Sequence, residues 1–422
     1  MVEQPIEVDV QIAGRAVPAG RLWTHRHGQS ESATFSYRED YLQRTDAYEL
    51  DPGLPLQAGQ QQTPVKQALF GAMSDCAPDG WGRRLLRRAE ADRARAAHTR
   101  QRGLTELDFL LGARDDLRQG ALRFRGHDSA LYLAVETEGV PHLIGLPRLL
   151  NAAEELERDE PTSEDLRLLL HGASSLGGAR PKAHVLDPEG RLAIAKFPSP
   201  TADDWDVIRW EAVALTLAVD AGIAVAEHDL HVIEDRPVLV VRRFDREDGG
   251  RIGYVSAMTM LQAKDGEQAS YLEIGQAIEE RSPNVVADLR ELWRRIVFTI
   301  LISNTDDHLR NHGFLRKSTA GWSLSPAFDL NPNPEGGAIQ LATAIDEHDA
   351  RASIATALEV AGLFRVSPAR AHAIVAEVSA ATERWRDVAR ATGLGAQQIA
   401  LLEPAFEHEQ SAAARELSSA PS

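Results

Sequence analysis

The first part of the chain alternates between apolar and polar residues in the way that strands do. Residues 6–12 place four aliphatic side chains on one face and acidic or amide side chains on the other. This two-residue period predicts a half-buried strand. Residues 33–37 predict a second strand, so we expect the chain to open with a small sheet.

Helical spacing of apolar residues follows the first strands. The turn at residues 78–80 precedes a predicted helix over residues 81–98. Thr105 begins a second helix, with Asp108 at the reciprocal capping position. Further helices are predicted over residues 161–170 and 205–219.

The remaining pattern places strands before helices. Strands are predicted over residues 191–197, 230–233 and 238–244, and nearly everything from about residue 271 onward has helical spacing. A polar loop at residues 303–314, followed by a short hairpin, interrupts these helices. We therefore predict an α+β fold of two lobes, a mixed β-rich N-terminal lobe and an all-α C-terminal lobe, with a ligand cleft between them.

Composition narrows the class of protein. At 422 residues the chain exceeds the usual size of a single core. Its 46 basic and 63 acidic residues give a net charge of −17, which argues against general nucleic-acid binding. Cys76 is the single cysteine, so a disulfide framework is excluded. No apolar run approaches the ~20 residues that span a bilayer, and the acidic N-terminus is unlike a signal peptide, so a cytoplasmic protein without a membrane partner is expected.

The helix over residues 81–98 is rich in arginine. Leu85 and Leu86 would face inward, and a solvated basic face is the simpler interpretation. A contact with nucleic acid or with an acidic partner is the alternative. The arginines concerned are Arg83, Arg84, Arg87, Arg88, Arg93 and Arg95.

A glycine-rich segment at residues 172–182 has the composition of a phosphate-binding loop. Glycines allow backbone N–H groups to close on phosphate oxygens, and Lys182 can add a positive charge. The spacing is not that of a Walker A motif, and an ordinary flexible loop is the alternative.

Lys196 and Glu211 are candidates for a pair that holds a nucleotide. Lys196 shares a strand face with apolar residues, and Glu211 lies on the apolar stripe of the next helix. An acid there is costly unless it is paired, and kinases use such a lysine–glutamate pair to hold the α- and β-phosphates. The alternative is that Glu211 points to the helix edge and meets water.

The loop at residues 303–314 has the spacing of a kinase catalytic loop. Asp306 would take the proton of an attacking hydroxyl, while Asn311 and Asp329 would hold magnesium. Arg310 could neutralise the transferring phosphoryl group. A zinc site is the rival, but Leu309 stands where a zinc protease needs glutamate, so we expect His308 to organise the loop by bonding to backbone.

Several motifs together resemble the HipA family of serine/threonine kinases, the toxins of HipBA-type toxin–antitoxin pairs. The matching segments are LFGAMSDCAPDGWGRRLL, SSLGGARPKA, AKFP, VLVVRRFDR, NTDDHLRNHGF and PAFDLNP. They run through most of the chain, and the NxDxHxxN loop followed by FDL is the most specific of them. The resemblance implies a protein-kinase-like fold that uses ATP and Mg²⁺.

The resemblance also implies roles for individual residues. Asp306 would be the catalytic base, with Asn311 and Asp329 on magnesium. Ser175, with Ser174 as second choice, would be the autophosphorylated serine whose modification ejects the phosphate loop. The implied nucleotide-binding residues are Gly177, Gly178, Ala179, Arg180 and Lys182 in the loop, Lys196, Glu211 and His308, and Arg242, Arg243 and Phe244 at the hinge that meets adenine.

Two positions depart from the family pattern. Arg180 replaces the usual glutamine of the glycine loop, which affects the geometry of the loop. Arg310 replaces a lysine, which keeps the positive charge but changes the geometry of the hydrogen bonds that the side chain can donate. The resemblance implies three domains, an N-terminal subdomain (1–125), a kinase N-lobe (126–262) and a helical C-lobe (263–422). Its implied partners are a protein substrate, a HipB-like helix-turn-helix antitoxin, and operator DNA reached mainly through that antitoxin.

The leading expectation is therefore a toxin kinase that phosphorylates a cellular protein, for which the family suggests an aminoacyl-tRNA synthetase. One alternative is a non-catalytic co-repressor that acts on DNA with the antitoxin through the arginine-rich helix. Another is a small-molecule phosphotransferase of related fold. Growth arrest separates the first alternative from the kinase, and the destination of the transferred phosphate separates the second.

Overall fold

The first strands form an antiparallel sheet, and the opening strand, Ile6–Ile12, buries Glu7 and Asp9 as well as Val8 and Val10, so it is covered on both faces rather than half-buried as predicted. The computed structural model describes residues 4–28, 30–135, 139–335, 339–347 and 349–419. The sheet has the order β4-β3-β2-β1-β5, and its inward side chains, Val8, Val10, Leu22 and Phe35 among them, are fully buried. Its strands are β1 (Ile6–Ile12), β2 (Arg15–His27), β3 (Ser30–Tyr37), β4 (Gln61–Gln62) and β5 (Leu122–Arg125).

The first strand was predicted with its observed bounds, whereas β2 was not predicted. Pro18 and Gly20 interrupt the strand signal within β2. Pro18 pairs with Asp9 at the point where the register of β1 and β2 shifts, so the proline lies at a bulge. A bulge is one of the few places where a sheet accepts proline, and this local irregularity hides the strand from pattern analysis.

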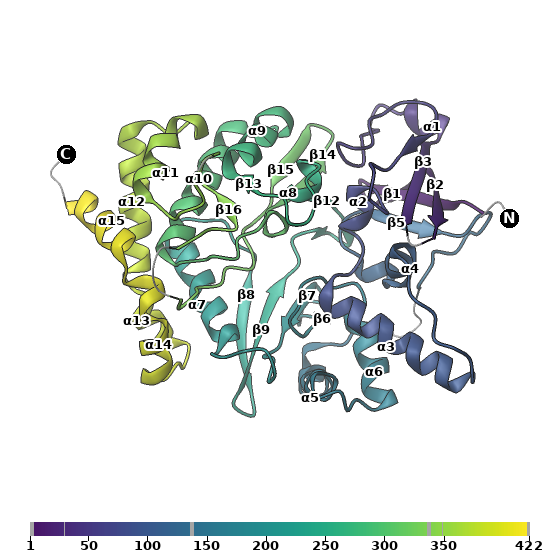
Figure 1. The fold of residues 1–422 in the computed structure, drawn as a ribbon, viewed down its shortest axis with the longest axis horizontal. Helices are drawn as coiled ribbons and strands as arrows, with labels where there is room; N and C mark the ends of the chain where they lie inside the picture. The colour runs from purple at the N-terminus through teal and green to yellow at the C-terminus, as the bar shows by residue number, and fades with distance from the viewer. Residues whose placement is uncertain (1–3, 29, 136–138, 336–338, 348, 420–422) are drawn as a thin grey trace. The chain divides into compact units, whose positions relative to one another are not determined.

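The chain divides into two compact units, Met1–Ala202 with Val240–Val255 and Asp203–Leu239 with Ser256–Ser422. Both strands and helices are present, so the fold is mixed in α and β structure. The first unit contains the five-stranded sheet, and the second contains most of the long helices (Figure 1). The three-part division at residues 125 and 262 stays a prediction.

In the first unit, helices pack beside an antiparallel hairpin formed by β6 (Lys182–Leu186) and β7 (Leu192–Lys196). α6 (Ser163–Ala173) contacts α3 (Gly80–Ala96), α5 (Leu146–Glu157) and β6 (Figure 1). The other elements of the first unit are α1 (Glu39–Leu42), α2 (Gly71–Ser74), α4 (Glu106–Gly112), the 3₁₀ turns Asp115–Leu117 and Leu143–Gly145, β10 (Arg246–Glu247) and β11 (Gly250–Arg251).

In the second unit, α10 (Val285–Leu301) forms the centre of the helical packing. It contacts α9 (Tyr271–Arg281), α11 (Ile354–Val360) and α12 (Pro368–Thr382), and its last eight residues are buried. The remaining helices are α7 (Val207–Asp220), α8 (Ala257–Met260), α13 (Trp385–Ala391), α14 (Ala396–Phe406), α15 (Glu409–Ser419) and the 3₁₀ turns Leu309–Asn311 and Ala361–Phe364.

The prediction of an all-α C-terminal lobe is wrong in detail. β14 (Gly313–Ser318) and β15 (Gly321–Leu324) form the hairpin expected after the polar loop, while β13 (Ala269–Ser270) pairs in parallel with β16 (Thr343–Ala344). The last pair is too short to leave a period in the sequence. β8 (His228–Ile233), β9 (Arg236–Arg242) and β12 (Gly253–Ser256) complete the strands, and β9 and β12 cross the division between the units.

Two local predictions are confirmed by the capping geometry. The Thr105 hydroxyl accepts a hydrogen bond from the Asp108 N–H at 3.1 Å, and the Asp108 carboxylate accepts one from the Thr105 N–H at 2.9 Å. Thr162 and Asp165 form the same capping box at the start of α6. Among the described residues, no helix combines the length and the apolar character that crossing a bilayer requires.

Candidate functional site

The glycine loop (residues 174–182) connects α6 to β6 in the first unit, and its tip is exposed at residues 177–179. Gly178 has a φ of +73°, and a Cβ added there would lie 2.6 Å from Nζ of Lys182. The lysine ammonium therefore lies directly beside the glycine backbone, where a side chain would displace it.

Lys182 and Lys196 are direct partners in the register of β6 and β7. Residues opposite each other on an antiparallel pair share a face with Cβ atoms ~5 Å apart, and like charges placed this way repel. The hairpin thus presents two lysines on one face, with the ammonium of Lys182 beside the tip of the glycine loop.

The predicted hinge, residues 242–244, begins at the last residue of β9 and has a buried centre. Arg243 is 7% exposed, while Arg242 and Phe244 are half-buried. The Arg243 guanidinium donates to Asp245 and to the carbonyl of Leu117. The Arg243 side chain is therefore engaged within the fold, and a contact of this segment with adenine stays a prediction.

His184 connects this arginine to Gly172, near the end of α6 and just before the glycine loop. Nε2 of His184 lies 2.8 Å from a nitrogen of Arg243, and Nδ1 lies 2.9 Å from the carbonyl oxygen of Gly172. A guanidinium can only donate, so Nε2 accepts and Nδ1 carries the proton donated to Gly172. Burial, reinforced by the charge of Arg243, holds the pKa of His184 well below its usual value.

The neutral state of His184 predicts a loss of stability in mild acid. In the unfolded chain this histidine takes a proton as the pH falls through ~6.5, whereas in the folded chain it stays neutral. The unfolded state then binds more protons, and between pH 7.5 and 6.0 the free energy of unfolding should fall by about 0.8 kcal/mol on account of this residue. Denaturant unfolding of wild type and His184→Gln at both pH values measures the difference.

An exposed histidine provides the control for this experiment. His27 lies on β2 with its side chain in solvent. His27→Gln should therefore keep the pH dependence of the wild type. If the free energy of unfolding of His184→Gln falls between pH 7.5 and 6.0 as much as that of wild type, a neutral His184 is not the cause of the fall.

In the second unit, Glu211 lies within α7 and is 3% exposed. The alternative that it points to the helix edge and meets water is therefore wrong. Its neighbours Trp210 and Ala212 are also buried, so α7 is covered around much of its circumference. A carboxylate at such a position requires polar partners.

The polar loop begins where α10 ends, and it is built around the backbone of Asp306. The carbonyl oxygen of Asp306 accepts a 2.8 Å bond from the His308 N–H and a 3.0 Å bond from Nδ2 of Asn311. The Asn311 N–H donates in turn to the carbonyl of His308 at 2.8 Å. Asp306 is exposed, so its carboxylate is presented on a fixed backbone.

The segment containing Asp329 returns along this loop. The Ser325 N–H donates to the carbonyl of Gly313 at 2.8 Å, and the Asn333 N–H donates to Ser303 at 3.2 Å. A small cavity is lined by Asn311 together with Phe328 and Leu330, the two neighbours of Asp329. The predicted base and both predicted metal ligands therefore belong to one local assembly.

The residues at this assembly fit a magnesium ion by donor type. Asn311 and Asp329 offer an amide oxygen and a carboxylate, the hard donors that Mg²⁺ prefers. Nδ2 of Asn311 is engaged by the loop, so the other end of the amide is the one suited to a cation. Asp329 has a φ of +59°, and residues held in this region gather at functional sites.

Asp307, to which the sequence analysis assigns no role, supports the loop from inside. Its buried carboxylate accepts a hydrogen bond from the hydroxyl of Tyr271 and another from Thr299, and it lies 3.3 Å from Nε2 of His312. Burial alone would raise the pKa of Asp307, but the charge of His312 and these hydrogen bonds lower it. The loop thus has an exposed acid and a buried acid side by side.

The side chains of His308 and Arg310 differ in their contacts within this loop. His308 organises the loop through its backbone, and its buried Nδ1 has no hydrogen-bond partner among the described residues. Arg310 forms a bidentate ion pair with Asp265 at 2.7 and 3.0 Å. Within the described ranges, no group of three His, Cys, Asp or Glu side chains could hold a metal ion.

The two candidate serines at the start of the glycine loop differ in their contacts. The Ser174 hydroxyl accepts a 3.3 Å bond from the Arg114 N–H. Ser175 is 7% exposed, and its oxygen has no hydrogen-bond partner among the described residues. Arg180 is half-buried beside the exposed tip.

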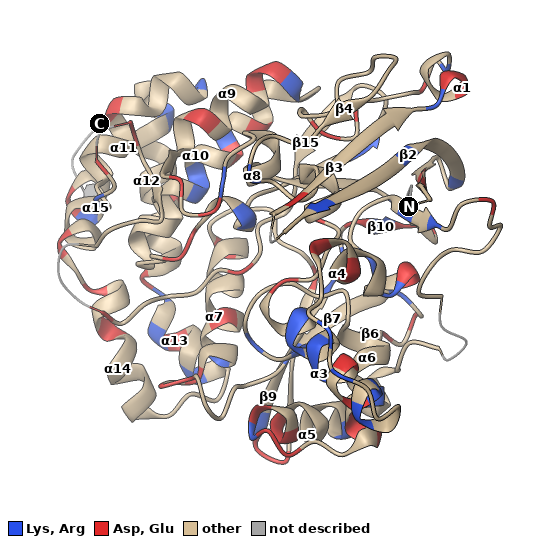
Figure 2. Cartoon of the chain, turned by 45° about the vertical axis from the view of Figure 1, so that its right-hand side comes forward, with Lys and Arg blue, Asp and Glu red and all other residues tan. Residues whose placement is uncertain are grey.

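Basic residues gather along α3 (Figure 2). Their side chains are largely engaged by neighbouring groups. Arg87 lies over the ring of Phe109. The other five arginines form ion pairs, Arg83 with Glu106, Arg84 with Glu157, Arg88 with Asp159, Arg93 with Glu90 and Arg95 with Asp92. These contacts favour the interpretation of a structural and solvated face.

Comparisons with known proteins cover both units. The model of the HipA-like C-terminal domain matches residues 174–385, and that of the HipA N-terminal domain matches residues 9–113. A provisionally named kinase of Haemophilus influenzae is 29% identical over 109 residues, which are 23% of this chain and 32% of that protein. The provisionally named kinase Y4dM of Sinorhizobium fredii is 30% identical over 152 residues, 32% of this chain and 36% of that protein.

The matches to these curated relatives thus span only about a third of their length. A solved structure covers the fold more fully. HipA of Shewanella oneidensis, determined with HipB and its operator DNA, matches 99% of this chain and 100% of its own with a TM-score of 0.66 at 16% identity. The C-terminal domain model alone spans half of the sequence, and the chain therefore belongs to the HipA family.

Proposed function

We propose that this protein is an ATP- and Mg²⁺-dependent serine/threonine protein kinase with a two-lobed, protein-kinase-like arrangement. The observation that carries the proposal is the opposed pair Lys182 and Lys196 at the glycine loop. Two lysines on one face beside an exposed glycine tip suit the phosphates of a nucleotide. In the second unit, an ordered loop that presents Asp306 supplies the residue types for transfer of the γ-phosphoryl group.

The chemistry assigns each residue a separate task. Asp306 accepts the proton of the attacking serine or threonine hydroxyl, and its exposed carboxylate is open to a protein substrate. Lys196 would hold the nucleotide phosphates and Glu211 would orient that lysine. Arg310 would have to exchange Asp265 for the phosphoryl group in order to neutralise it, and the exposure of that ion pair makes the exchange inexpensive.

Magnesium would be held by Asn311 and Asp329, and it would neutralise charge on the phosphate oxygens during transfer. The backbone bonds that hold residues 325–333 along the polar loop fix the separation of these two ligands before the nucleotide arrives. Such preorganisation lowers the cost of assembling the site.

The direct test is incubation of the purified protein with ATP labelled on its γ-phosphate and a cell extract. We expect label in protein, on serine or threonine, and dependence on Mg²⁺. Label that appears only in a small molecule would identify a metabolite phosphotransferase instead. Absence of any transfer in the presence of Mg²⁺ would overturn the proposal.

We further propose that the kinase switches itself off by phosphorylating Ser175. The buried position of this serine means that a phosphate cannot be accommodated without movement of the glycine loop. Mass spectrometry after incubation with ATP should find phosphate on the peptide that contains Ser174 and Ser175, with loss of activity as it accumulates. An active enzyme with an unmodified peptide would contradict the switch.

The biological role we propose is that of a toxin, neutralised by a small helix-turn-helix antitoxin that carries it to operator DNA. The ion-paired arginines of α3 favour DNA contact through such a partner over direct binding. Expression of the chain alone should arrest growth. A non-catalytic co-repressor would leave the cells growing.

A further inference from the structure

The structure assigns a positioning role to the tryptophan turn (residues 78–82), which holds the glycine loop in place. This segment begins α3 and is about a hundred residues away in sequence from the loop. The inference rests on the proposed function, because the loop is the one assigned to nucleotide phosphates. It adds residues that contact the loop rather than the nucleotide.

Trp81 bonds to the glycine loop at two points. Its backbone N–H donates to the carbonyl of Gly178 at 2.8 Å, and its indole Nε1 donates to the carbonyl of Lys182 at 2.9 Å. The side chain is fully buried. One rigid residue therefore fixes the tip of the loop and the residue at which β6 begins.

The glycines on either side of Trp81 allow this close approach. A Cβ on Gly80 would lie 3.1 Å from the carbonyl oxygen of Gly178. A Cβ on Gly82 would lie 2.5 Å from Cβ of Pro78 and 2.7 Å from the carbonyl oxygen of Leu176. Contacts this short with backbone force a shift, so residues at both positions must be small for the loop to stay where it is.

The tip of the loop is open to solvent. Residues 177–179 are exposed, and Ser175 is buried without a hydrogen bond among the described residues. A buried hydroxyl that lacks a partner disfavours the position it occupies. The tryptophan turn therefore opposes a tendency of the loop to move outward, and weakening the turn should release the loop.

The experiment compares Trp81→Phe with wild type in the full-length protein. Phenylalanine keeps an aromatic ring but removes the indole bond to Lys182. Hydrogen exchange should become faster in residues 174–182, and the dissociation constant for ATP with Mg²⁺ should rise about threefold to tenfold, the equivalent of one hydrogen bond. The KM for ATP should rise in proportion, while kcat changes little, because the catalytic loop is untouched.

Gly82→Ala should also speed hydrogen exchange in residues 174–182, because the added methyl group pushes the loop away. Gly80→Ala should speed it less. Two controls match these changes. Trp293→Phe removes an indole bond of 2.9 Å to the carbonyl of Ala357 in the other unit, and Gly103→Ala adds a methyl group to open space. Both controls should leave exchange in residues 174–182 as in wild type.

The outcomes separate this inference from the proposed function. Unchanged exchange of the loop in both Trp81→Phe and Gly82→Ala overturns the positioning role, whatever the enzyme does. If wild type binds no ATP, the proposed function fails, but the exchange comparison still decides whether the turn holds the loop. If Trp81→Phe does not fold, Gly80→Ala and Gly82→Ala decide the question in its place.

Discussion

Asp306→Asn is expected to lower phosphoryl transfer from ATP by about 10²- to 10⁴-fold, the usual contribution of a general base. Asparagine has nearly the same shape, and the backbone bonds from His308 and Asn311 to the Asp306 carbonyl do not involve the replaced group. The loop should therefore keep its conformation while losing the proton acceptor. We expect kcat to fall and the KM for ATP to stay within about twofold of wild type.

The matched control for this variant is Asp235→Asn. Asp235 is exposed in the turn between β8 and β9, with a φ of +68° that asparagine also tolerates. Asp235→Asn makes the same change of charge in the same unit as Asp306→Asn, and it should leave phosphoryl transfer from ATP unchanged. Transfer by Asp306→Asn at the wild-type rate would exclude this carboxylate as the base, and equal losses in both variants would point to net charge instead.

Local sequence patterns predicted the elements whose partners lie close in the chain. The bounds of β1, the capping box at Thr105 and the burial of Glu211 on α7 all follow from periods or caps within a few residues. The loop around Asp306 was recognisable for the same reason, because its chemistry lies in one short segment. Its link to the Asp329 segment required only a hairpin between them.

Long-range contacts could not be predicted in this way. Trp81 contacts a loop a hundred residues away, and its motif gave no sign of that partner beyond the glycines beside it. Asp307 stands next to Asp306 in a polar loop, and it is Tyr271 and Thr299 that hold its carboxylate in the core. A polar residue in a polar loop has no periodic signal of burial, so its role emerges only from packing.

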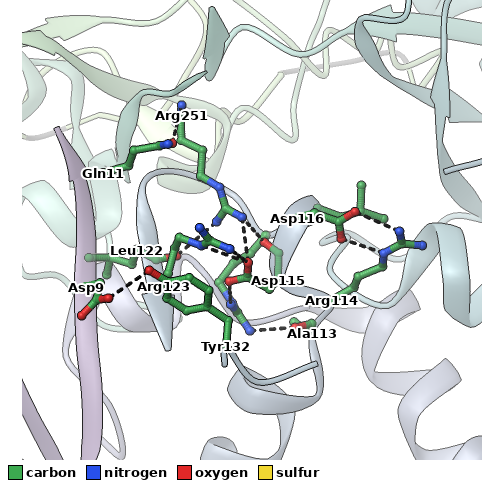
Figure 3. A network of polar contacts seen from close by, with 12 residues as sticks. Asp9, Gln11, Ala113, Arg114, Asp115, Asp116, Leu122, Arg123, Tyr132 and Arg251 are labelled. Carbon is green, nitrogen blue, oxygen red and sulfur yellow. Dashed lines mark hydrogen bonds and ion pairs between the residues drawn. The ribbon is translucent and has the colours of Figure 1, made fainter. Parts of the chain in front are cut away.

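The second large effect is expected at Asp115, another residue that sequence reasoning missed. This acid is 1% exposed and accepts bonds from Arg123 and Arg251 at 2.5 and 3.1 Å (Figure 3). It also accepts a 3.2 Å bond from Arg118. Arg118 is fully buried, which lowers its pKa to about 10 although the charge of Asp115 opposes the shift. One carboxylate therefore compensates three guanidinium groups in a site with little water.

Asp115→Ala should lower the free energy of unfolding by about 3–5 kcal/mol, because it leaves buried positive charge without its partner. Denaturant unfolding followed by circular dichroism and tryptophan fluorescence measures the loss. The control is Asp46→Ala, which removes a bidentate but part-exposed pair with Arg44 in the same unit and should cost less than ~1 kcal/mol. Similar losses in the two variants would show that burial does not decide the cost.

The position of Asp115 gives this loss a functional consequence. Arg251 follows β9 by nine residues and also donates to the backbone carbonyl of Asp115, while Asp245 accepts a bond from the N–H of Gly120. These contacts tie residues 245 and 251, just after the predicted hinge, to the segment between α4 and β5. Asp115→Ala should therefore speed hydrogen exchange in residues 242–251 more than in β7, and uniform exchange across the unit would exclude a specific link to the hinge.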